Sequence, residues 1–194
     1  AMLGWTIHVQ ISGDCCFDSS GKIAKECEAE FSFVIDDEMV GHVNTYLDAI
    51  KDFKGDEGTL FVEQRASIEV ITKEEDAEGT ADVVIIRGAE LQVHDLKYGM
   101  AFVDATLNKQ LIVYAKAVYE EYSLLFDIDK ILLVIHQPRL GSMPTYPMTV
   151  DELDNEVSRL SEAARLATAL LEVESVTDVE PYLVVGEHCR KNYC

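Results

Sequence analysis

The chain has 194 residues with 16 Lys or Arg against 36 Asp or Glu, which gives a formal net charge of −20. This charge excludes a protein that binds DNA through a broad basic surface, because such affinity comes largely from Lys and Arg contacts to phosphate. The chain is 48% hydrophobic, enough for a buried core, and we predict a single folded domain over residues 1–194. It has no apolar run of the ~20 residues that cross a bilayer, so we expect a cytoplasmic protein with no membrane association.

The five cysteines are an odd number and lie near the two ends of the chain. They are Cys15, Cys16, Cys27, Cys189 and Cys194. A secreted disulfide framework normally has an even number of cysteines at regular spacing. The cysteines therefore argue against a disulfide-stabilised secreted protein.

The first recognisable pattern along the chain predicts a helix. From Asp36 to Phe53 apolar residues recur every three or four positions, which predicts a helix that Asp36 or Asp37 caps. Two short segments rich in β-forming residues follow, Thr59–Glu63 and Arg65–Ile71, and we predict a strand in each.

An acidic turn then leads to two more predicted strands and a second helix. Ala81–Ile86 and Glu90–Lys97 are rich in β-forming residues, and Arg87-Gly88-Ala89 between them is a hairpin signal. Helical spacing of apolar residues returns between Leu107 and Tyr122. Ile131–Ile135 is a continuous apolar run, as expected for a strand that is covered on both faces.

A capping box at Thr149–Glu152 predicts the start of a last helix, over about residues 149–172. The predicted order is therefore helix, strands, helix, strand, helix. This order indicates an α/β fold.

Two acids and a lysine stand at the ends of the predicted hairpin strands. Alternation along a strand places Asp95 and Lys97 on one face, and Asp82 lies at the start of the preceding strand. Two carboxylates from adjacent strands can hold a hard cation such as Mg²⁺, which activates a bound water. Lys97 can orient that water or stabilise charge on phosphorus. The spacing fits phosphodiester hydrolysis, but by itself it favours a solvated surface pair.

Four segments in order resemble the PD-(D/E)XK nucleases of the RecB type, and more narrowly a phage-encoded branch of that superfamily. The segments are Gly79-Thr-Ala-Asp82, Val93-His-Asp-Leu-Lys-Tyr-Gly99, Asn108-Lys-Gln-Leu-Ile-Val-Tyr-Ala115 and Gln137-Pro-Arg139. The resemblance covers about residues 35–140 well and the two ends loosely. It implies a PD-(D/E)XK (restriction-endonuclease-like) core, with a mixed central sheet flanked by helices.

The resemblance also implies roles for individual residues. The catalytic set would be Asp82, Asp95, Lys97, Gln110 and Tyr114. Asp82 and Asp95 would bind Mg²⁺ or Mn²⁺ together with the backbone carbonyl of Leu96. Gln110 and Tyr114 match the Gln-x-x-x-Tyr motif, whose side chains would hydrogen-bond near the active site and the DNA.

The chain departs from this family before the first predicted helix. RecB-type nucleases often have an N-terminal helix there that brings a His and a Glu to the metal, and Gly21–Glu28 occupies a comparable place. Lys25 stands where the His is expected, and a protonated lysine cannot bind Mg²⁺. Glu26 or Glu28 can substitute, and Glu63 is a further candidate metal ligand or a solvent-facing strand residue.

Some RecB-type nucleases also hold a [4Fe–4S] cluster between an N-terminal cysteine and the C-terminal segment. The matching residues here would be Cys15, Cys16, Cys189 and Cys194. A cluster needs four ligands, so both ends of the chain would have to contribute. Free thiols, a disulfide and a zinc site are the alternatives.

We therefore expect a metal-dependent deoxyribonuclease, an exonuclease in phage DNA recombination or processing in the host cytoplasm. Its partners would be DNA, further copies of itself, and a phage single-strand annealing protein or a host recombination protein. The expected cationic path for DNA is Lys97, Lys109, Lys116 and Arg139. The alternatives are a catalytically inactive nuclease-fold subunit and an acidic DNA mimic that binds a host DNA-processing protein.

Overall fold

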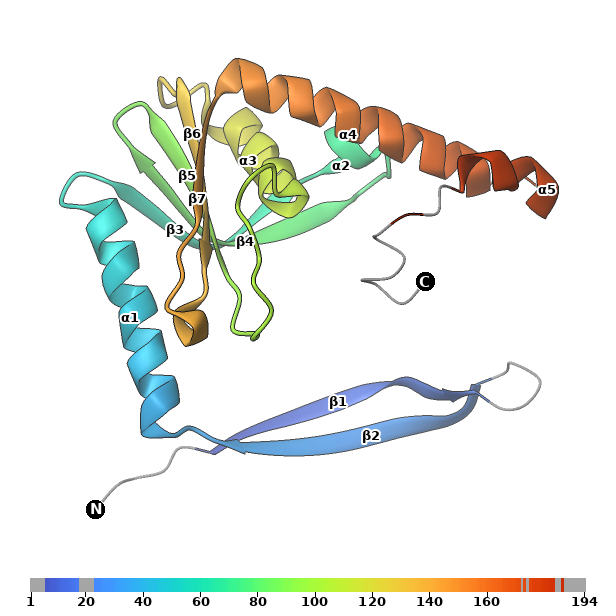
Figure 1. Ribbon diagram of the computed structural model, residues 1–194, viewed down its shortest axis with the longest axis horizontal. Helices are drawn as coiled ribbons and strands as arrows, with labels where there is room; N and C mark the ends of the chain where they lie inside the picture. The colour runs from blue at the N-terminus through green and yellow to red at the C-terminus, as the bar shows by residue number, and fades with distance from the viewer. Residues whose placement is uncertain (1–5, 18–22, 172, 174, 184–185, 187–194) are drawn as a thin grey trace. The chain divides into compact units, whose positions relative to one another are not determined.

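The computed structural model describes the backbone of residues 6–17, 23–171, 173, 175–183 and 186, and side chains within this set from residue 35 onward, Val176 excepted. The chain forms two compact units, Ala1–Ile50 and Lys51–Cys194 (Figure 1). We predicted a single domain over residues 1–194, which includes both units, and this stays a prediction.

The first unit contains an antiparallel hairpin of two long strands, β1 (Thr6–Phe17) and β2 (Ile23–Val34). We predicted no strand in this region. Because β2 begins at Ile23, the N-terminal helix that the nuclease resemblance implies around Gly21–Glu28 is wrong: the backbone from Ile23 onward is extended and paired with β1.

Helix α1 (Asp37–Lys54) confirms the first predicted helix. Asp36 caps it, since the backbone N–H of Met39 donates to Asp36 Oδ1 at 2.8 Å. At its C-terminal end Phe53 packs edge-on against the ring of His94, with the ring centroids 4.9 Å apart.

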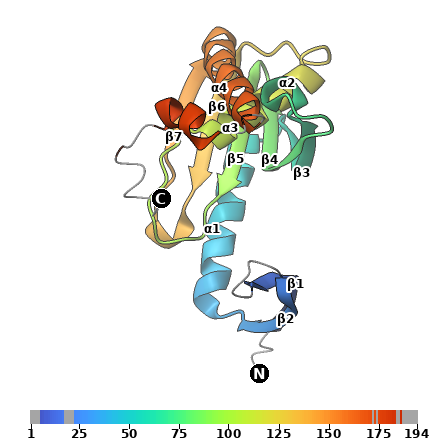
Figure 2. The ribbon, with the colours of Figure 1, turned by 90° about the vertical axis from the view of Figure 1, so that its right-hand side faces the viewer.

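The second unit is built on a five-stranded sheet in the order β3-β4-β5-β6-β7 (Figure 2). The strands are β3 (Thr59–Ser67), β4 (Glu78–Arg87), β5 (Glu90–Leu96), β6 (Lys130–His136) and β7 (Thr145–Thr149). Only the β5–β6 pair is parallel, and the other neighbours are antiparallel. The α/β fold with a mixed sheet flanked by helices is therefore confirmed.

The remaining helices of the second unit are partly those expected. They are α2 (Glu69–Thr72), α3 (Lys109–Tyr122), α4 (Val150–Leu171), α5 (Val176–Val179) and the 3₁₀ turns η1 (Pro138–Leu140) and η2 (Glu180–Tyr182). Helix α4 begins with the predicted capping box: Thr149 N–H donates to Glu152 Oε2 at 2.7 Å, and Glu152 N–H donates to Thr149 Oγ1 at 3.2 Å. Among the described residues, no helix combines the length and apolar character needed to cross a membrane.

The core of the second unit lies between one face of the sheet and helices α3 and α4. Val93 of β5 and Leu133 of β6 are fully buried there, as are Leu111 and Val118 of α3. Leu153 of α4 is also fully buried in this core. This packing fixes α3 above the end of β5, where the candidate site lies.

Two elements of the second unit differ from the sequence predictions. The strand predicted over Arg65–Ile71 is confirmed only for Arg65–Ser67, the end of β3, because Glu69–Thr72 forms a helical turn that buries Ile71. Strand β7 was not predicted. It contains Pro147, which a strand tolerates at the edge of a sheet, where one side needs no hydrogen bonds.

Candidate active site

The hairpin of β4 and β5 brings the two predicted aspartates together. Val83 pairs with His94 in the antiparallel register, so one step further along the strands Asp82 lies opposite Asp95. Asp82 Oδ2 accepts a hydrogen bond of 2.8 Å from the backbone N–H of Leu96. Gly88, with a left-handed φ of 61°, makes the tight turn that sets this register.

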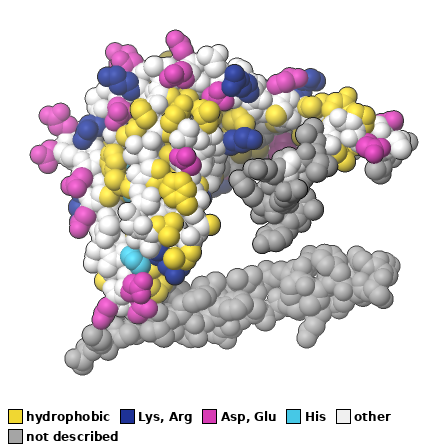
Figure 3. Space-filling view, in the orientation of Figure 1, with side chains coloured by type: hydrophobic (Ala, Val, Ile, Leu, Met, Phe, Trp, Pro, Cys, Tyr) yellow, Lys and Arg dark blue, Asp and Glu magenta, His cyan; other side chains and the backbone are white. Residues whose placement is uncertain are grey.

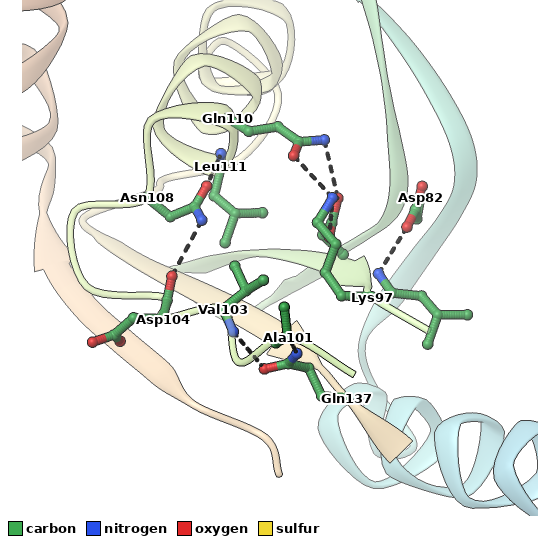
Figure 4. A network of polar contacts seen from close by, with 11 residues as sticks. Asp82, Lys97, Ala101, Val103, Asp104, Asn108, Gln110, Leu111 and Gln137 are labelled. Carbon is green, nitrogen blue, oxygen red and sulfur yellow. Dashed lines mark hydrogen bonds and ion pairs between the residues drawn. The ribbon is translucent and has the colours of Figure 1, made fainter. Parts of the chain in front are cut away.

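Asp95 is the centre of a three-residue polar cluster with Lys97 and Gln110, which Figure 4 labels. Lys97 Nζ donates to Asp95 Oδ1 at 3.1 Å and lies 2.9 Å from Oδ2. Gln110 Nε2 donates to the same Oδ1 at 3.1 Å, and Gln110 Oε1 accepts from Lys97 Nζ at 3.0 Å. The structure therefore joins three of the predicted site residues in mutual contact.

One oxygen of this buried carboxylate is left without a hydrogen bond. The Asp95 side chain is only 5% exposed, and its Oδ2 meets Lys97 as an ion pair but without hydrogen-bonding geometry. Burial raises the pKa of Asp95, and the nearby charge of Asp82 raises it further, while the hydrogen bond and charge of Lys97 oppose the rise. A buried carboxylate oxygen with unused lone pairs suits a metal ligand.

The structure gives Tyr114 a contact different from the predicted one. Its ring is half-buried and packs on the core, against the start of β4. A Cβ on Gly79 would lie 2.5 Å from Tyr114 Cε1, so the first residue of the Gly-Thr-Ala-Asp segment must be glycine for the ring to fit. The predicted hydrogen bonds of Tyr114 near the active site and DNA stay a prediction.

We expect Gly79→Ala to lower the free energy of unfolding by about 1–3 kcal/mol, the usual cost of adding a methyl group to a filled space. Equilibrium denaturation in urea would measure the loss. Gly99→Ala is the matched control, because a Cβ at Gly99 meets no atom within 4 Å. Equal stability of the two variants would contradict the close packing of Gly79 on Tyr114.

Of the further candidate metal ligands, only Glu63 has a described side chain. Glu63 interrupts the β3–β4 ladder opposite Asp82, with a left-handed φ of 51°, and its side chain is exposed. Within the described part of the chain, no group of three or more His, Cys, Asp or Glu side chains is arranged to hold a metal. The role of Glu63 as a further metal ligand or a solvent-facing strand residue therefore stays a prediction.

Several predicted residues lie outside the described side chains. The structure gives only the backbone of β1 and β2 at Cys15, Cys16, Lys25 and Glu28. Cys189 and Cys194 lie outside the described residues altogether. The iron–sulfur, zinc and disulfide alternatives and the Glu28 ligand therefore stay predictions.

One residue of the expected cationic path, Lys116, is paired with acidic side chains. Lys116 Nζ lies 2.7 Å from Asp154 Oδ1 and 2.5 Å from Glu120 Oε1, and these acids raise the pKa of Lys116 against the lowering effect of burial. Its charge is paired within the protein, and a role for Lys116 in a path for DNA stays a prediction. Arg139 instead lies over the ring of Tyr98, 5.3 Å from its centroid.

Two buried polar arrangements lie near the site. Gln137, within the Gln-Pro-Arg segment, is 1% exposed and bonds the main chain of the loop after β5. On the opposite face of the sheet His94 Nδ1 lies 2.9 Å from His136 Nε2. Burial lowers the pKa of His94 to about 3, with help from His136, and that of His136 to about 4, so both rings are neutral at pH 7.

Residues 14–194 match the family described as DUF2800, a protein family of unknown function. The chain belongs to the DUF2800 family. The match includes every residue of the Asp82, Asp95, Lys97 and Gln110 cluster and the whole of the five-stranded sheet. In this DUF2800 member the site is thus part of the shared family region.

Proposed function

We propose that this protein is a Mg²⁺- or Mn²⁺-dependent deoxyribonuclease and that its mixed sheet is a PD-(D/E)XK core. The observation that carries the proposal is the buried Asp95, which is bonded by Lys97 and Gln110 on one oxygen and meets only the Lys97 ion pair, without a hydrogen bond, on the other. The resemblance of the four motif segments favours an exonuclease that acts in phage DNA recombination or processing.

The donor set fits a hard divalent cation. Asp82, Asp95 and the carbonyl of Leu96 offer only oxygen, which Mg²⁺ and Mn²⁺ prefer, and such ions complete their shell with water. A cation would also satisfy the buried Oδ2 of Asp95. When bound, the metal would lower the pKa of a water and neutralise phosphate charge.

The protein's own residues hold this site in order. Asp82 binds the Leu96 N–H and fixes the end of β5, which carries Asp95. Gln110 bonds both Asp95 and Lys97, and so sets their separation. Lys97 places an ammonium group where it stabilises the negative charge that develops on phosphate. Hydrolysis adds one water across one P–O bond and leaves a phosphate on one product and a hydroxyl on the other.

The alternative function is an inactive nuclease-fold protein or an acidic DNA mimic, and the net charge of −20 favours it. A mimic imitates phosphate charge and has no use for a lysine held between Asp95 and Gln110. The Lys97 contacts therefore weigh toward the enzyme.

The test combines DNA cleavage with metal binding. We expect the wild type to degrade linear DNA with Mn²⁺ and not with EDTA, and Asp82→Asn to be at least about tenfold slower. Mn²⁺ should raise the melting temperature of the wild type and not that of Asp82→Asn. Asp127→Asn, an exposed aspartate after α3, is the matched control and should behave as wild type.

Two results would count against the enzyme. If linear single- and double-stranded DNA both stay intact after long incubation with Mn²⁺, the protein is not a nuclease, and the inactive nuclease-fold protein or the DNA mimic is favoured. Full activity in Asp82→Asn would show that cleavage comes from elsewhere in the chain or from a contaminant.

A further inference from the structure

The loop between β5 and α3 holds two large apolar side chains in water. Phe102 is 63% exposed and Met100 is 61% exposed, although both lie within five residues of Lys97. On the face shown in Figure 3, hydrophobic side chains gather over β7 and the loop that precedes α3. Exposed groups of this size gathered in one place usually mark a binding surface.

The buried side chain of Gln137 fixes the main chain on both sides of Phe102 (Figure 4). Its Oε1 accepts the backbone N–H of Val103 at 2.9 Å, and its Nε2 donates to the carbonyl of Ala101 at 2.8 Å. Gln137 itself is 1% exposed, and Val103 packs against the core. Phe102 is therefore presented to solvent by an anchored loop.

Both ends of this loop are tied to the candidate site. At its start the Lys97 N–H donates to the carbonyl of His136 at 2.9 Å, and Arg139 Nη1 donates to the carbonyl of Tyr98 at 3.4 Å. At its end Asn108 caps α3, accepting from the Leu111 N–H at 3.2 Å. The loop thus joins the strand that carries Asp95 and Lys97 to the helix that carries Gln110.

We propose that Phe102 and Met100 form a stacking surface for the nucleobases of a DNA strand whose phosphate lies at Asp95 and Lys97. This inference rests on the proposed nuclease function and adds how the substrate is held. Aromatic and apolar side chains stack on every base, since each base has a flat π-face, so such binding needs no particular sequence.

If the substrate is DNA, the charge of the protein requires contacts other than ion pairs to hold it. At −20 the molecule repels a polyanion, and of the four candidate cations Lys97 and Lys116 are paired with acids, while Arg139 lies on the ring of Tyr98 in this loop. Stacking on bases is a source of affinity that does not require positive charge. A strand of DNA beside the site supplies such bases.

The test compares DNA with bases and DNA without them. For a short single-stranded oligonucleotide, we expect Phe102→Ala to raise KM about tenfold with kcat within twofold of wild type. For the same oligonucleotide with abasic residues next to the cleaved bond, Phe102→Ala and wild type should have equal KM. Phe102→Trp should retain the wild-type KM on intact DNA, because it keeps an aromatic face.

The controls separate this inference from the nuclease proposal. Leu124→Ala removes another exposed apolar side chain, 94% exposed and outside the loop, and should leave KM unchanged. An unchanged KM in Phe102→Ala, with an active wild type, would overturn the stacking surface alone and point to a partner protein for the loop. A wild type that neither cleaves nor binds DNA would overturn both proposals. Because Phe102 is exposed, its truncation should not change the melting temperature.

Discussion

Lys97→Met should cleave DNA about 10²–10³-fold more slowly than the wild type at saturating Mn²⁺, the usual loss when one group that stabilises transition-state charge is removed. The ammonium is held at one place by Asp95 and Gln110, so no other cation in this cluster can take its role. Methionine keeps the length and apolar character of the lysine stem without its charge. The loss should therefore appear in kcat while the fold is kept.

The measurement is the single-turnover rate at pH 8. Lys97 lowers the pKa of Asp95, so its removal raises that pKa, and alkaline pH with saturating metal keeps Asp95 ionised in both proteins. Lys130→Met, an exposed lysine at the start of β6, is the matched control and should retain the wild-type rate. A Lys97→Met rate within threefold of wild type would remove Lys97 from the mechanism.

Much of the second unit could be predicted because its signals are local. The helices α1, α3 and α4 have apolar residues at helical spacing and capping residues at their starts, and their bounds are close to those predicted. The contact of Asp95 with Lys97 follows from strand alternation. The contact with Gln110 follows from the motif on the next helix.

The rest depends on contacts between distant parts of the chain. Glu69–Thr72 is rich in β-branched residues, yet it forms a turn that buries Ile71 against the core. Strand β7 forms only because β6 offers it an edge. Gln137 bonds Val103 across 34 positions of sequence, and no local pattern reports such a pairing.

Asp95→Asn should abolish cleavage and Mn²⁺ binding, yet the metal-free protein should be at least as stable as the wild type at pH 7. Burial raises the pKa of Asp95, so the folded state holds this carboxylate in its ionised form at a free-energy cost. Asparagine carries no charge to bury and can still accept a hydrogen bond from Gln110. Lys97 loses its charged partner but keeps Gln110 Oε1 as an acceptor, and its side chain is 32% exposed, so water can solvate the ammonium.

The sign of the pH dependence follows from the raised pKa. Below the pKa of the unfolded state both states are protonated at Asp95, so this residue has no effect on stability. As pH rises, the unfolded state releases its proton first, and the free energy of unfolding falls until pH passes the raised folded pKa. One group gives a slope of at most about 1.4 kcal/mol per pH unit.

Metal binding reverses this penalty, because a cation stabilises the ionised form of Asp95. The raised pKa makes protons compete with Mn²⁺ at a higher pH than for an ordinary carboxylate, so affinity should fall as pH is lowered through the mildly acidic range. Melting temperatures from pH 5 to 8, with Mn²⁺ and with EDTA, measure both effects. Asp129→Asn, an exposed aspartate before β6, should keep the wild-type Mn²⁺ response.

Two outcomes would contradict the role given to Asp95. If Asp95→Asn keeps the Mn²⁺-dependent rise in melting temperature, the Oδ2 of Asp95 is not a metal ligand. If metal-free Asp95→Asn melts well below the wild type, the ion pair with Lys97 stabilises the fold and the carboxylate is structural. Lost metal binding together with retained stability would show that the Asp95 carboxylate serves metal binding. A carboxylate that serves folding would instead lower the stability when it is removed, because burying it costs free energy only when it lacks its ligand.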